Sequence, residues 1–210
     1  MKTGFFLDQR ESRRQLQRLS KGCSVLDLFS YTGGFAIAAA RGGAVRTTTV
    51  DQSAAAVAQS LRNYRLNGLE AEVADAELPL SLPGQAVHRL VAMDCGAFLS
   101  GARERGELFD IVVCDPPSMA PSEKARAAAL RKYVELNRGS LQALREGGLL
   151  LTCSCSSHIS EDLRGAVEEA GQREGCSLEV VSQARAATDH PVRRGFPEGD
   201  YLQTLFVRVL

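Results

Sequence analysis

The sequence predicts a Rossmann-like α/β fold with a seven-stranded, mainly parallel sheet that includes one antiparallel strand. Three observations lead to this prediction. Apolar, β-branched runs alternate with helical patterns along the chain, which is typical of a parallel sheet covered by helices on both faces. A glycine-rich turn at residues 30–35 joins the first strand to the first helix, and several strands end in an acidic residue. Ligands of such sheets bind outside the carboxyl ends of the strands, where these residues gather.

In the first half of the chain, four apolar segments have the pattern of strands. They are residues 24–29, 46–51, 90–94 and 109–115. One helix is expected at residues 34–42, closed by glycine, and another from its cap Ser53 to about residue 67. Prolines and a glycine make residues 72–85 irregular. The continuous apolar run before Pro116 and Pro117 is typical of a strand buried on both faces.

In the second half, helices and strands alternate again. Helical composition extends over residues 124–146 and 160–174, and the first of these helices ends at a glycine pair. Strand patterns occupy residues 149–153, 178–181 and 202–210. The last two strands are joined by the loop of residues 189–197, and we expect them to form the antiparallel pair.

The composition restricts the class of protein. The 210 residues suit one sizeable domain. No run of about 18 apolar residues is present to span a bilayer, and the apolar patch near the N-terminus is too short for a secretion signal. A cytoplasmic protein without membrane contact is therefore expected. Because the formal net charge is zero, a grip on nucleic acid would need local basic patches or another domain.

The six cysteines are spread through segments that we expect to form the core. None of them has the CxxC spacing of a structural zinc site. Reduced thiols in a cytosolic protein, with no metal site, are the expectation that fits this distribution.

Acidic residues at three strand ends indicate a nucleoside cofactor. Asp27 ends the first strand, and Asp51 ends the second about twenty residues later, where it can bind a ribose diol. The turn lacks the GxGxxG spacing of a dinucleotide site, which favours a cofactor without phosphate. S-adenosylmethionine fits: the turn would meet its amino-acid tail, Asp51 its ribose and Asp94 its adenine. As an alternative, each acid alone is a helix cap or turn former, but their joint placement favours the ligand.

Several motifs resemble one family. The chain is similar to the catalytic domain of the bacterial 23S rRNA 5-methylcytosine methyltransferases, of the large-subunit methyltransferase I type. The motifs are GFFLDQR at the start, DLFSYTGGFA, VDQS, DPPS and the late loop HPVRRGFPEGDYL. The resemblance implies a class I methyltransferase fold, S-adenosylmethionine as cofactor with S-adenosylhomocysteine as product, and 23S rRNA as substrate. A homodimer stays open as an assembly.

The resemblance also implies a domain organisation. Residues 1–22 would form an N-terminal segment that packs near the cofactor site, and residues 23–210 would form the methyltransferase domain. Family members carry an RNA-binding PUA domain ahead of this point, and no PUA domain is expected in this chain.

The family's functional residues carry over onto matching positions. Gln9 and Arg10 would approach the cofactor, Asp27 and the following turn would hold its methionine end, and Asp115 would face the target base. The full set expected at the cofactor is Gln9, Arg10, Asp27, Phe29, Tyr31, Thr32, Gly33, Gly34, Asp51, Gln52, Ser53, Asp94, Cys95, Asp115 and Pro116. The set expected at the substrate is Pro117, Ser118, His190, Arg193 and Arg194.

Methylation of cytosine at C5 needs a thiolate, because C5 becomes nucleophilic only after addition at C6. In RNA 5-methylcytosine enzymes the nucleophile follows a glycine pair by seven residues, which favours Cys155. Cys153 is the alternative, because Thr152, Cys153 and Ser154 match the usual threonine-cysteine-serine triplet. Residues two apart in a strand point to the same face, so both cysteine side chains would point the same way. Both would otherwise be small buried hydrophobes. Ser118 stands where a second cysteine often helps product release, so a one-cysteine cycle is implied, with Asp115 or water taking the C5 proton.

Two other functions compete with this interpretation. DPPS would suffice for nitrogen methylation of a purine, and a non-catalytic RNA- or protein-binding module could keep the fold as a scaffold. His190 is either solvated or a contact to RNA. A basic stretch near the start is either a solvated helix face or an RNA contact. It consists of Arg13, Arg14, Arg18 and Lys21.

Overall fold

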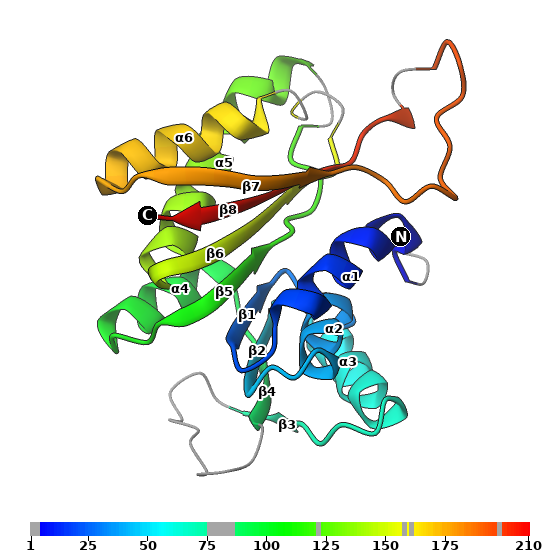
Figure 1. Cartoon of the computed structure of the whole chain (residues 1–210), viewed down its shortest axis with the longest axis vertical. Coiled ribbons are helices and arrows are strands. Elements are labelled where there is room, and N and C mark those ends of the chain that lie inside the picture. The colour runs from blue at the N-terminus through cyan, green and yellow to red at the C-terminus, as the bar shows by residue number, and fades with distance from the viewer. Residues whose placement is uncertain (1–4, 75–86, 121–122, 157–158, 160–161, 197–198) are drawn as a thin grey trace.

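A computed structural model describes residues 5–74, 87–120, 123–156, 159, 162–196 and 199–210. Over this part of the chain, eight strands form one sheet in the order β3-β4-β2-β1-β5-β6-β8-β7 (Figure 1). The strands are β1 (Ser24–Leu28), β2 (Arg46–Asp51), β3 (Glu72–Val73), β4 (Val87–Ala92), β5 (Phe109–Cys114), β6 (Leu144–Ser154), β7 (Leu178–Ala184) and β8 (Gln203–Val209).

The predicted count of seven strands is wrong by one. The additional strand is β3, whose two exposed residues pair in parallel with Arg89 and Leu90 of β4. It lies at the start of the segment expected to be irregular. Two exposed residues at the sheet edge carry no local apolar pattern, so pairing with β4 rather than sequence periodicity defines this strand. The rest of that segment, residues 75–85, lies outside the described residues.

The parallel topology and the single reversed strand are confirmed. β8 runs antiparallel to both β6 and β7, and the other pairings are parallel. From β1 the strand order proceeds to β2 on one side and to β5 on the other. The strand order therefore reverses between β1 and β5, which is where an open α/β sheet binds its ligands.

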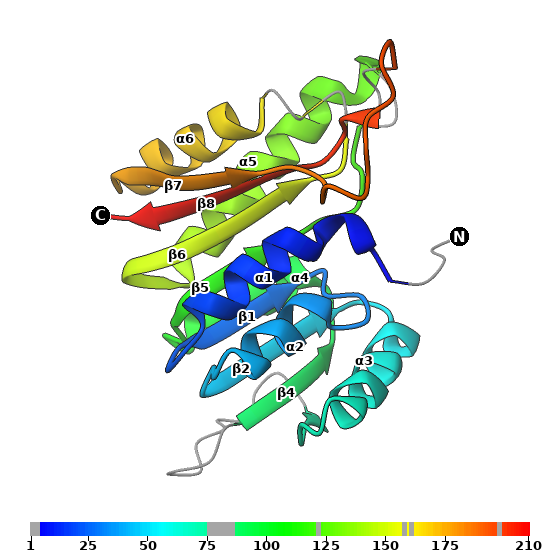
Figure 2. The same cartoon turned by 45° about the vertical axis from the view of Figure 1, so that its right-hand side comes forward.

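Helices cover both faces of the sheet (Figure 2). One face carries α1 (Arg10–Leu19), α2 (Gly34–Arg41) and α3 (Ala54–Leu66), and the other carries α4 (Cys95–Glu104), α5 (Arg126–Gln142) and α6 (Leu163–Glu174). Two short 3-10 helices are η1 (Leu7–Gln9) and η2 (Glu123–Ala125). None of the helices in the described residues is long and apolar enough to cross a membrane.

The central strands are buried on both faces, and their alternate residues divide between two cores. Leu26 and Leu28 of β1 pack with α4, α5 and α6, whereas Val25 packs with α1 and α2. β5 behaves in the same way, with Val112 on one side and Val113 on the other. A side-chain period of two in a strand covered on both faces produces this division, and it explains why β5 is almost wholly apolar.

Helix boundaries follow their capping residues, with one correction. Ser53 caps α3 by accepting from the Ala56 N–H at 3.3 Å, as predicted. α5 ends at Gln142, four residues before the predicted end, because Leu144 already pairs with Phe109 at the start of β6. That pairing is a tertiary contact which the helical composition of the segment does not reveal.

α4 begins directly after Asp94, whose side chain caps it. The sequence had not predicted this helix. Residues 160–161, at the predicted start of the helix that the structure has as α6, lie outside the described residues.

Candidate cofactor and substrate site

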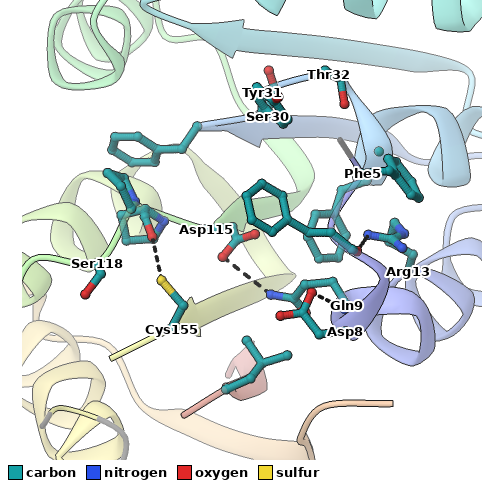
Figure 3. A pocket seen from close by; sticks show the side chains of 17 residues that line it. Phe5, Asp8, Gln9, Arg13, Ser30, Tyr31, Thr32, Asp115, Ser118 and Cys155 are labelled. Carbon is teal, nitrogen blue, oxygen red and sulfur yellow. Dashed lines mark hydrogen bonds between the residues drawn. The ribbon is translucent and has the colours of Figure 1, made fainter. Parts of the chain in front are cut away.

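A cavity of about 270 Å³ lies at the carboxyl ends of β1, β5 and β6. It combines the turn after β1, the proline motif after β5, the residue after β6 and the N-terminal segment around η1 (Figure 3). Its lining is Phe5, Phe6, Asp8, Gln9, Arg13, Phe29, Ser30, Tyr31, Thr32, Gly34, Phe35, Asp115, Pro116, Pro117, Ser118, Cys155 and Leu202. Aromatic rings and Leu202 supply an apolar wall, and a few polar groups converge inside it, the combination expected of a small-molecule site.

The turn after β1 has a strained backbone. Phe29 and Tyr31 have φ angles of 57° and 50°, and Gly33 has 78°. Left-handed conformations of bulky residues persist only where the surroundings hold them. Here the Tyr31 N–H donates to Asp51 Oδ2 at 2.8 Å and the Ser30 N–H to the Val50 carbonyl at 3.1 Å. The end of β2 therefore fixes the shape of the turn.

Protein neighbours account for glycine at position 33, whereas at position 34 the near contact is the half-exposed ring of Phe5. A Cβ on Gly33 would lie 2.1 Å from Ser60 Oγ of α3, and one on Gly34 would lie 2.9 Å from Phe5 Cε2. The sequence attributed both glycines to close approach of a ligand. Packing against α3 and the positive φ angle are sufficient reasons for glycine at position 33.

Asp27, an expected cofactor residue, is fully buried near the end of β1 and does not itself line the cavity. Its Oδ2 accepts from the Ala36 N–H at 2.9 Å, and its Oδ1 has no hydrogen-bond partner among the described residues. Burial raises the pKa of Asp27 from 3.8 to about 8, and the carboxylates of Asp115 and Asp51 add to this rise. Ser30 Oγ is buried without a partner in the described part of the chain as well. Buried acceptors of this kind suit a cationic donor such as the ammonium of an amino acid.

Arg13 is a cavity residue that the sequence did not assign to the cofactor site. It is only 9% exposed, its Nη1 donates to the Phe6 carbonyl at 2.7 Å, and its guanidinium lies 4.1 Å from the Phe5 ring centre. Burial lowers its pKa, although the nearby acids oppose this. The available signal was helical spacing, because Gln9, Arg13 and Leu16 share one face of a helix.

The N-terminal segment is tied to the end of the sheet by hydrogen bonds. Tyr201 donates its hydroxyl to Asp8 Oδ2 at 2.8 Å, and Thr204 donates to Gln9 Oε1 at 3.3 Å. Gln9 in turn donates through Nε2 to Asp115 Oδ1 at 3.4 Å (Figure 3). Residues nearly 200 positions apart in the chain thus orient the carboxylate after β5.

The two candidate cysteines have different environments. Cys155 lines the cavity, with its Sγ 4.0 Å from the Pro116 carbonyl oxygen (Figure 3). Cys153 is fully buried below Thr204, whose Oγ1 lies 3.4 Å from its Sγ, and burial raises its pKa well above the ordinary value. Because β6 ends at Ser154, Cys155 lies beyond the sheet core that encloses Cys153. The structure therefore brings Cys155, and not Cys153, to the cavity beside Asp115.

Several expected cofactor residues lie outside the cavity lining. Both oxygens of Asp51 accept backbone N–H groups, from Tyr31 at 2.8 Å and from Ser53 at 2.9 Å. Gln52 is exposed. Asp94 is exposed too and accepts from the Ala97 N–H at 3.0 Å as the cap of α4. Asp51 thus stabilises a turn and Asp94 caps a helix, which are the alternative roles that the sequence allowed for these acids.

Cys95 packs behind the turn. Its buried Sγ accepts from the Phe29 N–H at 3.2 Å, and burial raises the pKa of Cys95 to about 12. This contact supports the strained conformation of Phe29.

The basic residues expected near cofactor or RNA lie at the periphery. Arg10 binds Glu11 at 3.1 Å and Asp189 at 2.5 Å. His190 Nδ1 lies 3.1 Å from Asp189 Oδ1. Arg193 and Arg194 are exposed in the loop between β7 and β8. None of these four basic residues lines the cavity.

The strand order that reverses between β1 and β5 and the strained turn after β1 are features of a class I methyltransferase fold, and the cavity beside them has the character of a small-molecule site. The chain belongs to the S-adenosylmethionine-dependent methyltransferase family, whose model matches residues 1–195. Its cofactor is S-adenosylmethionine, and the carboxylate and apolar wall described above fit that group.

Similar proteins support the family assignment. The chain is 41% identical over 99% of its length to a ribosomal RNA large subunit methyltransferase of Deinococcus radiodurans, and 38% identical over 99% to a ribosomal RNA large subunit methyltransferase I of Pseudoalteromonas translucida. It covers 47% and 49% of these proteins, so it spans about half of their length.

Solved structures agree on the fold. The chain is similar over its whole length to the structure of a methyltransferase complexed with S-adenosylhomocysteine, with a TM-score of 0.83 and 29% identity. The match covers 51% of that protein's chain. An S-adenosylmethionine-dependent methyltransferase from Streptococcus mutans matches 99% of the chain and 50% of its own, with a TM-score of 0.82 and 29% identity.

Proposed function

We propose that this chain methylates C5 of a cytidine in 23S ribosomal RNA, in the cytoplasm, with Cys155 as the nucleophile. The observation that carries the proposal is the position of the Cys155 sulfur in the same cavity as Asp115 and the turn after β1. The ribosomal RNA substrate is supported by the names of the two relatives and by the motifs shared with the 5-methylcytosine family.

The two charged groups of the methionine part of the cofactor would be held by protein groups of opposite charge. Asp27 would accept from the ammonium of the methionine part, and the buried Arg13 would bind its carboxylate. Asp51 keeps acceptor capacity for the ribose, since each of its oxygens has received one N–H. Asp94 is proposed for the adenine amine. When bound, S-adenosylmethionine supplies an electrophilic methyl group.

Cys155 would open the reaction on the base. Its thiolate forms a bond to C6 of cytosine, and the electron pair of the C5–C6 double bond becomes available at C5 for methylation. Afterwards the C5 proton is transferred to Asp115 or to water, the double bond reforms, and the bond from sulfur to C6 breaks. Asp115 also orients the base, and the Gln9 amide that donates to it at 3.4 Å keeps this carboxylate directed into the cavity.

Pro117, Ser118 and the loop between β7 and β8 would contact the substrate. The two prolines make the segment after β5 rigid, and Pro117 and Ser118 lie at the cavity mouth. His190, Arg193 and Arg194 are proposed to bind phosphates of the RNA around the target.

The matched pair of cysteines provides the test. Methyl-labelled S-adenosylmethionine is incubated with the protein and unmodified 23S rRNA, and the nucleosides are separated by mass spectrometry. We expect 5-methylcytidine from the wild type and from Cys153→Ala, and none from Cys155→Ala with cofactor affinity retained. Full activity of Cys155→Ala would overturn the nucleophile assignment, and a methylated purine would establish the competing nitrogen methylation.

A trapping experiment examines the same step independently of turnover. RNA with 5-fluorocytidine at the target lacks the proton that must leave C5, so the covalent adduct accumulates. We expect a protein–RNA band on a denaturing gel for the wild type and Cys153→Ala. Its persistence in Cys155→Ala would contradict the proposal. Absence of saturable S-adenosylmethionine binding in calorimetry would favour the scaffold function.

A further inference from the structure

The neutral net charge conceals a strong separation of charge along the chain. Residues 10–68, all of which the structure describes, contain nine arginines and lysines and three acids. This is a surplus of six positive charges, whereas the whole chain has 25 of each sign. The remaining residues therefore carry an equal negative surplus. One of these cations, Arg46 of β2, pairs at 3.6 Å with Glu107, which lies outside this range. The other eight lie in α1, α2 and α3 or in the turn after α1, so this face of the sheet is basic although the protein is neutral.

Buried acids increase the contrast at the surface. Asp27 and Asp51 are both buried in or behind the cofactor site. Glu11 is then the one acid of residues 10–68 that reaches solvent, and it is shared between Arg10 and Arg14. The surface formed by α1, α2 and α3 consequently has several cations for one carboxylate.

A groove of about 690 Å³ crosses this basic face. It lies between α1, α2 and α3 and includes Arg10, Arg14 and Arg41 in its lining, with no acid among the described residues that line it. Five residues belong to both the groove and the cofactor cavity, so the two spaces adjoin. They are Phe5, Arg13, Tyr31, Thr32 and Gly34.

Linked amide side chains line the α3 side of the groove. Gln59 donates to Asn63 Oδ1 at 3.1 Å, Asn63 donates to the Thr32 carbonyl at 3.0 Å, and Arg41 donates to Asn67 Oδ1 at 3.0 Å. Amides offer both donors and acceptors, as the edges of nucleobases do. The half-exposed ring of Phe5 at the junction with the cavity adds a surface on which a base can stack.

We propose that this groove binds the single-stranded RNA that flanks the target nucleotide, which rests on the proposed RNA substrate. Cations along a groove follow a phosphate backbone, and amides and an aromatic ring contact unpaired bases. A strand that leaves the cavity past Phe5 enters the groove directly. Arg14 and Arg41 would bind phosphates on its two walls.

The test uses two arginine variants with a matched control. Arg14→Glu and Arg41→Gln remove cations of the groove, whereas Arg164→Glu reverses an exposed helical arginine on α6 that, like Arg14, pairs with a glutamate of its own helix. Fluorescence anisotropy measures binding of a labelled single-stranded RNA of about 12 nucleotides at several salt concentrations. Calorimetry measures S-adenosylmethionine affinity, and 23S rRNA methylation gives KM and kcat.

We expect Arg14→Glu and Arg41→Gln each to weaken RNA binding about tenfold and to reduce the slope of log K against log salt by about 0.7. The KM for RNA should rise with little change in cofactor affinity, and Arg164→Glu should match the wild type. Photo-crosslinking of the wild type to RNA should place the linked peptides in α1, α2 or α3, which requires no variant.

Four results would overturn the proposal that the groove binds single-stranded RNA. If the wild type methylates RNA but both variants keep its KM and salt slope, the proposed function stands and the groove is wrong. Crosslinks confined to other elements lead to the same conclusion. If the wild type neither binds nor methylates RNA, the RNA function itself fails along with the groove, and equal binding of duplex DNA would indicate a general polyanion surface instead.

Discussion

Replacing Asp27 with asparagine should have opposite effects on stability and on cofactor binding. The carboxylate is fully buried, and its pKa in the folded protein is about 8 against an ordinary value of 3.8. Between these values the folded protein holds a proton that the unfolded chain has released. Unfolding then releases a proton, so the free energy of unfolding falls as pH rises through this interval.

The size of the effect follows from the two pKa values. Stability changes by about 1.4 kcal/mol per pH unit over this interval. Between about pH 5.5 and 7.5, the titration of Asp27 should lower the free energy of unfolding of the wild type by about 2.5 kcal/mol in total. The asparagine side chain has no such proton equilibrium and resembles the protonated acid in shape. Without cofactor, the free energy of unfolding of Asp27→Asn should therefore increase relative to that of the wild type as pH rises.

Cofactor binding should change in the other direction. A cationic ammonium at Asp27 favours the ionised carboxylate, so binding to the wild type near pH 7 should release about one proton. Asparagine supplies no charge, and the loss of a charged hydrogen bond of about 2 kcal/mol corresponds to about 30-fold weaker binding. Calorimetry in buffers of different ionisation enthalpy measures both quantities.

The comparison uses urea denaturation of wild type, Asp27→Asn and Glu168→Gln at several pH values. Glu168→Gln is the control because the Glu168 side chain, on α6, is 54% exposed. In this variant the slope of the free energy of unfolding against pH should equal that of the wild type. Equal pH slopes in wild type and Asp27→Asn, together with cofactor binding that releases no proton, would refute the reasoning about this carboxylate.

Two further substitutions test the framework of the site. Gly33→Ala should lower the free energy of unfolding by about 2 kcal/mol or more. The new Cβ would lie 2.1 Å from Ser60 Oγ, and the backbone has a φ angle of 78° there. An unchanged midpoint of urea denaturation would contradict this prediction. Tyr201→Phe removes the hydroxyl that donates to Asp8 and should lower the free energy of unfolding, measured by urea denaturation, by about 1 kcal/mol. It should also accelerate protease cleavage near residue 8. An unaltered cleavage rate would show that this hydrogen bond does not hold the N-terminal segment.

Local patterns were sufficient for most of the fold. The strand, turn and helix of residues 24–42, the cap at Ser53 and the antiparallel pair at the end of the chain are confirmed. Each depends on near neighbours in sequence or on the period of apolar residues, which a chain displays without its tertiary contacts. β3 and the early end of α5 were missed because pairing with a distant strand defines them.

By itself, the sequence determined the sheet class, the cofactor and the cluster of acids at the strand ends, since these follow from periodicity, turn composition and shared motifs. Only the tertiary structure decided which side chains meet. It encloses Cys153 beneath Thr204 and leaves Cys155 in the cavity, and it brings Arg13 of α1 beside the turn after β1. The reason is physical: burial, and with it the raised pKa of Asp27, depends on the atoms that surround a group, and those atoms come from segments far apart in the chain.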